Sequence, residues 1–97
     1  MKIAYIAGPL RGDHRYQNIQ KAREVAKKYW RLGYAVICPH TNSGNMVGLD
    51  EAQVMEGCIE ILWRCDVIVM MKGWENSEGS VTELREAIES DLENIYE

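Results

Sequence analysis

The amino-acid sequence predicts a three-layer α/β/α fold of the Rossmann-like (flavodoxin-like) kind, built on a parallel sheet of three to four short strands. Short apolar runs alternate with longer segments of helical periodicity along the whole chain, which is typical of βαβ units. Such units bring parallel strands together through right-handed crossovers. A length of 97 residues allows one hydrophobic core, so we expect a single domain over residues 1–97.

The first predicted strand and helix are separated by a polar loop. Residues 2–7 form an apolar run that ends at a Gly-Pro pair, which indicates a buried strand followed by a sharp turn. After the loop over residues 10–16, apolar residues recur on one helical face through residues 19–30. Gly33 marks the end of this helix.

The middle of the chain predicts a strand, a loop and a second helix. Residues 34–38 form a short strand that Pro39 ends. Residues 40–48 are rich in Asn, Ser, Thr and Gly and lack periodicity, so we expect a loop. Asp50 can cap the following helix, which carries apolar side chains inward over residues 54–65.

The last third of the chain repeats the same alternation. Residues 66–71 predict a fully buried strand because they are almost continuously apolar. The Gly- and Ser-containing segment 72–80 leads into a helix with one apolar side over residues 81–92. Residues 94–97 predict a short fourth strand, supported by one isoleucine and one tyrosine.

Composition and charge argue against several classes of partner. The formal net charge is −4 and no predicted face carries a run of Lys or Arg, so we expect neither nucleic acid nor a membrane surface as a partner. The three cysteines fall in apolar runs without metal-ligand spacing, which favours structural thiols and predicts neither a metal nor a cofactor. With no signal-peptide layout and no apolar stretch of roughly 20 residues, we expect a cytoplasmic protein.

Ligands of parallel α/β sheets bind where loops leave the carboxyl ends of the strands, and the first such loop covers residues 8–16. Gly8 lets the backbone approach a ligand, and Arg11 suits bidentate contact with a phosphate. A plain turn with an exposed arginine would have the same sequence. Gly8 and Arg11 are therefore candidates for a phosphate site.

The loop over residues 72–80 precedes a helix N-terminus, where free backbone amides and the helix dipole favour an anion. Ser77 and Gly79 are therefore candidates for holding a phosphate. The competing interpretation is a plain helix cap, with Ser77 or Ser80 as the N-cap and Glu83 closing a capping box.

Two carboxylates and one tyrosine are candidates for chemistry. Glu83 falls in the first turn of the last predicted helix, where a carboxylate beside a sugar could act as a nucleophile or stabilise an oxocarbenium-like transition state. Asp66 begins the third strand, so it points away from the carboxyl-end face, and a structural role fits it equally well. Tyr5 could direct its hydroxyl into the cleft or lie in the core.

The remaining candidates also have structural interpretations. His14 and His40 fall in loops at the ligand-binding face, where solvated histidines are common. Trp74 could stack on a base or cover the edge of the core. The loop that follows the second strand offers side chains for the edge of a base, although a solvated loop has the same composition: Asn42, Ser43 and Asn45.

Three segments stand out together: YIAGPLRG (residues 5–12), CDVIV (65–69) and GWENSEGSVTE (73–83). In this order and spacing they resemble the nucleoside 2-deoxyribosyltransferase-like superfamily over nearly the whole chain. The sequence looks closest to the DUF4406 proteins, and it also resembles the 2'-deoxynucleoside 5'-monophosphate N-glycosidases.

The resemblance implies a double displacement at the N-glycosidic bond of a (deoxy)nucleoside 5'-monophosphate. Glu83 matches the glutamate that attacks the anomeric carbon, Asp66 matches an assisting aspartate, and Tyr5 matches the family tyrosine of the first strand. Water or a second base would then take the deoxyribosyl group. The residues implied to hold the 5'-phosphate are Gly8, Arg11, Ser77 and Gly79.

The sequence also departs from the N-glycosidases. Cys58 stands where they carry an aspartate, and Leu-Arg-Glu-Ala follows Glu83 in place of Leu-Gly-Arg-Ala. Because a neighbouring subunit often completes the site in this superfamily, the resemblance implies a homodimer or larger homo-oligomer. The alternative function is a non-catalytic nucleotide-binding or sensor module, which would bind a small-molecule nucleotide or nucleoside without turnover.

Overall fold

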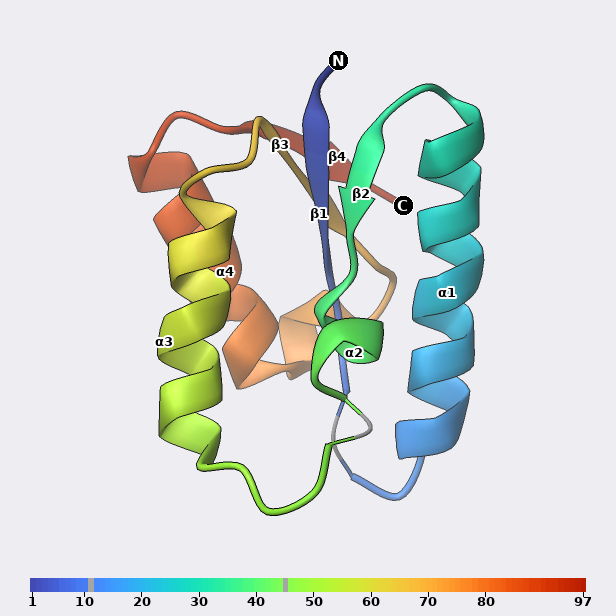
Figure 1. The fold of residues 1–97 in the computed structure, drawn as a ribbon, viewed down its shortest axis with the longest axis vertical. Coiled ribbons are helices and arrows are strands. Elements are labelled where there is room, and N and C mark those ends of the chain that lie inside the picture. The colour runs from blue at the N-terminus through green and yellow to red at the C-terminus, as the bar shows by residue number, and fades with distance from the viewer. Residues whose placement is uncertain (11, 45) are drawn as a thin grey trace.

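The computed structural model describes residues 1–10, 12–44 and 46–97. Its first half contains β1 (Ile3–Ala7), α1 (Arg15–Arg31), β2 (Ala35–Ile37) and α2 (Pro39–Asn42). Its second half contains α3 (Glu51–Leu62), β3 (Val67–Met70), the 3₁₀ turn η1 (Trp74–Asn76), α4 (Glu78–Glu89) and β4 (Glu93–Tyr96) (Figure 1). None of the helices in these ranges is long and apolar enough to cross a membrane.

The four strands form one parallel sheet in the order β2-β1-β3-β4. Tyr5 at the centre of β1 pairs with Ile37 of β2 on one side and with Ile68 of β3 on the other. The predicted fourth strand is confirmed, and it begins at Glu93, beside Val67 of β3. The predicted α/β class with a parallel sheet is therefore confirmed.

Helices cover both faces of the sheet, with α1 on one side and α3 and α4 on the other (Figure 1). Successive side chains of a strand point to opposite faces, so β1 contributes to the apolar layer on each face of the sheet. Its residues Ala4 and Ile6 pack with α1, whereas Tyr5 and Ala7 pack with α3 and α4. This alternation directs the Tyr5 side chain into the layer that also holds α4.

The region after β2 differs from the prediction of a continuous loop over residues 40–48. Pro39 to Asn42 form one helical turn, because proline is preorganised for the first position of a helix and the Cys38 carbonyl accepts from the Thr41 and Asn42 amides. Of the two interpretations of His40, the solvated loop histidine does not fit, since only 3% of it is exposed. The predicted cap at Asp50 is confirmed by its bond from the Ala52 amide at 2.9 Å.

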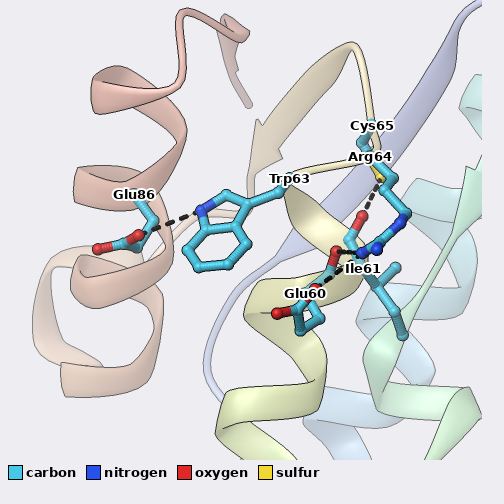
Figure 2. Close-up of polar contacts among 6 residues, drawn as sticks. All are labelled: Glu60, Ile61, Trp63, Arg64, Cys65 and Glu86. Atoms are coloured by element: carbon cyan, nitrogen blue, oxygen red, sulfur yellow. Dashed lines mark hydrogen bonds and ion pairs between the residues drawn. The ribbon is translucent and has the colours of Figure 1, made fainter.

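Polar contacts fix the end of α3 near α4, as Figure 2 shows. The Trp63 indole Nε1 donates to Glu86 Oε1 of α4 at 3.2 Å. Arg64 pairs with Glu60 at 2.8 Å, and both side chains are largely exposed, so this ion pair adds little stability. The Cys65 thiol donates to the Ile61 carbonyl at 3.3 Å, which makes it a structural thiol as predicted.

Candidate active site

A cleft of about 360 Å³ opens at the carboxyl-end side of the sheet, a size within the usual range of small-molecule sites. The loops predicted to follow the first, second and third strands all contribute to its lining. Its apolar wall consists of Ile6, Pro9, Leu10, Pro39, Val54 and Met55. The other residues that line the cleft could react with a ligand or contact it. They are Gly8, His40, Ser43, Cys58, Asn76, Ser77, Glu78, Gly79, Ser80 and Glu83.

Glu83 lines the cleft and forms a buried polar contact with Tyr5, which belongs to the core rather than to the cleft lining. The Tyr5 hydroxyl donates a hydrogen bond to Glu83 Oε2 across 78 positions of sequence. Tyr5 is fully buried and Glu83 is 7% exposed, so solvent screens this contact little. Glu83 lies in the second turn of α4 rather than the first, because the helix already begins at Glu78. The structure thus brings two of the predicted catalytic residues together.

Burial raises the pKa of Glu83 to about 7, and the bond from Tyr5 opposes that rise by stabilising the carboxylate. Burial and, secondly, the neighbouring Glu83 charge raise the pKa of Tyr5, so the phenol keeps its proton and remains a donor. A carboxyl group with a pKa near neutral can serve as a nucleophile or exchange a proton under physiological conditions.

His40 presents a second polar group to the cleft. A backbone carbonyl can only accept, so the contact of its Nε2 with the Pro9 carbonyl at 2.8 Å places a proton on Nε2. Burial lowers the pKa of His40, which favours the neutral ring with a lone pair on Nδ1. That buried Nδ1 has no hydrogen-bond partner within the described residues. A ligand N–H or O–H group would satisfy it.

The N-terminus of α4 faces the cleft, and Ser77 caps it. The Ser77 hydroxyl oxygen accepts from the Ser80 amide at 3.3 Å and from the Ser80 hydroxyl at 3.0 Å. The capping interpretation of Ser77 is therefore confirmed, but the predicted capping box is wrong, because Glu83 bonds to Tyr5 instead.

The glycines of the predicted phosphate site lie in close packing. A Cβ on Gly8 would be 2.6 Å from Met71 Sδ, and one on Gly79 would be 3.0 Å from Met55 Cε, so both positions leave little room for a side chain. Both glycines line the cleft. Arg11, the fourth predicted phosphate ligand, lies outside the described residues.

Asp66 does not join the cleft. Its Oδ2 accepts from the Ile3 amide at 2.8 Å, at the amino ends of β1 and β3, whereas the cleft is at the carboxyl ends. The side chain therefore satisfies a backbone donor where the sheet begins, which is the structural role that the sequence left open. The candidate aspartate thus lies at the opposite end of the strands from Glu83.

Two further candidates lie apart from the cleft wall. His14 precedes α1 and is exposed. Trp74 packs against the core on the α3 and α4 side, and its ring contacts that of Tyr96 at a centroid distance of 6.0 Å. The edge-covering interpretation of Trp74 therefore fits the structure.

Nearly the whole chain matches a known protein family. Residues 1–96 match the family described as a domain of unknown function, DUF4406. No curated protein matches the chain.

Two solved structures share the fold. The 2-deoxyribosyltransferase of Leishmania mexicana superposes with a TM-score of 0.74 at 18% identity, over 99% of this chain and 63% of that protein. The 2-deoxyribosyltransferase of the psychrotolerant bacterium Bacillus psychrosaccharolyticus gives 0.69 at 19% identity, over 97% of this chain and 70% of that protein. At these identities the likeness establishes the fold, and the chain spans less than two thirds of the first enzyme.

Proposed function

The chain belongs to the DUF4406 family, and from its fold and cleft we propose that it cleaves or transfers the N-glycosidic bond of a (deoxy)nucleoside 5'-monophosphate, with Glu83 as nucleophile. The observation that carries this proposal is a buried carboxyl group, bonded by Tyr5, at a cleft on the carboxyl-end side of a parallel sheet. The fold shared with two 2-deoxyribosyltransferases supports this choice of chemistry.

The proposed reaction is a double displacement. The ionised Glu83 oxygen forms a bond to the anomeric carbon, and the N-glycosidic bond breaks with its electron pair leaving on the base, which takes up a proton. Water or a second base then attacks the same carbon and releases Glu83. With a pKa of about 7, a substantial fraction of Glu83 is ionised at neutral pH. The Tyr5 bond holds one carboxylate oxygen and so orients the other.

Other groups of the cleft and of the first loop would recognise the rest of the substrate. We assign the 5'-phosphate to the N-terminus of α4, at Ser77 and Gly79, with Gly8 and Arg11 from the first loop, because a helix N-terminus attracts anions. The buried Nδ1 acceptor of His40 suits an N–H group of the base. Asp66 has no part in this proposal. The homo-oligomer remains a prediction, which sedimentation velocity would check.

The test is chromatographic detection of free base from a panel of ribo- and deoxyribonucleosides and their 5'-monophosphates. We expect the wild-type protein to release base from at least one monophosphate. Glu83→Gln should reduce the rate by on the order of 10³-fold or more, because the amide cannot form the glycosyl ester. Glu78→Gln is the matched control, since Glu78 is a carboxylate on the same helix and cleft without the Tyr5 bond.

Each other outcome has a definite meaning. Equal rates of base release by the wild type and Glu83→Gln would rule out Glu83 as the nucleophile. No release from any substrate, with nucleotide binding still detected by calorimetry, would favour a transferase that needs an acceptor base or the non-catalytic binding module. Adding a free base as acceptor separates those two.

A further inference from the structure

The first loop, which follows β1, is held in place by the segment that follows β3. At the start of the loop, the Met71 amide donates to the Ala7 carbonyl at 2.8 Å. Gly8 packs closely against the Met71 side chain, since an added Cβ would be 2.6 Å from its sulfur. The Pro9 ring lies beside Gly73, where an added Cβ would be 3.5 Å from Pro9 Cγ. These contacts limit the movement of the loop on the β3 side.

His40 holds the same loop from the β2 side, because α2 follows β2 and the strands β2 and β3 flank β1. Its Nε2 donates to the Pro9 carbonyl at 2.8 Å. His40 is only 3% exposed, so water competes little for this bond. A hydrogen bond across 31 positions of sequence therefore joins the loop after β1 to the segment after β2.

We propose that His40 is a positioning residue whose Nε2–H holds the Pro9 carbonyl and thereby sets where the first loop presents Gly8 to the 5'-phosphate of the ligand. The two nitrogens of one ring then have separate roles, because Nδ1 has no partner among the described residues and can accept from the ligand. Without the Nε2 bond the loop can shift at Pro9, and a displacement of about 1 Å is enough to weaken a positioned contact. The effect on phosphate binding rests on the proposed function, whereas the restraint on the loop does not.

Other contacts of the loop do not replace this bond. The Asn18 side-chain amide donates to the Leu10 carbonyl at 3.5 Å, which is long for a hydrogen bond. Packing at Gly8 and Pro9 limits movement toward β3 but does not orient the Pro9 carbonyl. Among the described residues, His40 is the one side chain that donates to this carbonyl. Removing the donor should therefore loosen the loop at Pro9.

Two substitutions separate the two nitrogens of His40. Glutamine places its amide nitrogen near the position of Nε2, so His40→Gln keeps a donor for the Pro9 carbonyl. Asparagine is one methylene shorter and reaches only the position of Nδ1, so His40→Asn loses that donor. Relaxation of the Leu10 ¹⁵N nucleus measures the mobility of the loop without turnover. We expect increased mobility in His40→Asn and near wild-type mobility in His40→Gln. His14→Asn, at an exposed histidine, is the control and should leave Leu10 unchanged.

Calorimetry with the common 2'-deoxynucleosides and their 5'-monophosphates measures the effect on phosphate binding. We expect His40→Asn to lose about fivefold of the preference for a monophosphate over its nucleoside, as for one lost hydrogen bond, and His40→Gln to keep that preference. A general loss of stability would weaken the binding of both members of a pair and leave their ratio unchanged. The ratio therefore separates positioning of the loop from a merely structural role.

Several results would overturn the proposal. They are unchanged Leu10 mobility in His40→Asn, an unchanged preference for the monophosphate in that variant, and equal losses in His40→Asn and His40→Gln. The ¹⁵N spectrum of the wild-type protein labelled at histidine provides a test that holds even if His40→Asn does not fold, because a neutral His40 with its proton on Nδ1 would also overturn it. If the wild type binds no member of any pair, the proposed function fails, and the relaxation measurement still decides whether His40 restrains the loop.

Discussion

Glu83 combines burial with a hydrogen bond that favours its ionised form. These two effects on its pKa oppose each other, and burial is the larger. The resemblance to the deoxyribosyltransferase-like superfamily pointed to Glu83 and Tyr5 separately, and the structure joins them by a hydrogen bond. It also pointed to Asp66, although the position of Asp66 at the start of the third strand already set it apart from the carboxyl-end face, and its bond from the Ile3 amide agrees with that position. His40 was a candidate at the ligand-binding face, but its burial could not be predicted, because the composition of a loop does not reveal the burial of one side chain.

The pH dependence of stability tests the environment of Glu83 directly. Because its pKa is raised, the folded state binds more protons than the unfolded state between the ordinary glutamate pKa and about 7. Stability should therefore fall as pH rises through this window. Glu83→Gln does not titrate, so its stability relative to wild type should increase between pH 4.5 and 7 by on the order of 3 kcal/mol.

Urea denaturation of the two proteins at several pH values measures this difference. Glu78→Gln is the comparison, since Glu78 is an exposed carboxylate of the same helix that lacks the Tyr5 bond. A constant difference between wild type and Glu83→Gln across the window would show that Glu83 titrates normally.

At the scale of elements, the strands followed from their apolar runs, and the helices followed from spacing and capping residues. Their observed boundaries differ from the predicted ones by a few residues where local backbone hydrogen bonds set the start of an element. The first helix begins at Arg15, inside the predicted loop, because the Asn18 amide already bonds to the His14 carbonyl. The turn α2 was not predicted, since four residues are too few to show helical periodicity.

The cap of α4 is the element that links folding to the cleft. Ser77→Ala removes the acceptor for the Ser80 amide and hydroxyl and should lower the free energy of unfolding by about 1 kcal/mol. Chemical denaturation checks this value. Ser90→Ala at the other end of the same helix is the control and should have a smaller effect, because its side chain supplies no N-cap. Equal losses in the two variants would argue against the cap.

At the scale of the whole molecule, the parallel sheet explains why residues far apart in sequence meet. Parallel strands place all their carboxyl ends on one side, so the loops after β1, β2 and β3 converge on one cleft. This convergence could be predicted from the alternation of strands and helices. The hydrogen bonds inside the cleft could not, because they depend on side-chain directions set by packing between layers.

The most direct test of the nucleophile is to locate a trapped sugar on the protein. The protein is mixed with a nucleoside 5'-monophosphate from which it releases base, quenched in acid, digested and mapped by mass spectrometry. We predict a glycosyl 5'-phosphate ester on the peptide that contains Glu83 and none in the Glu83→Gln variant. A sugar attached to a different residue, or base release that persists in Glu83→Gln, would contradict the account.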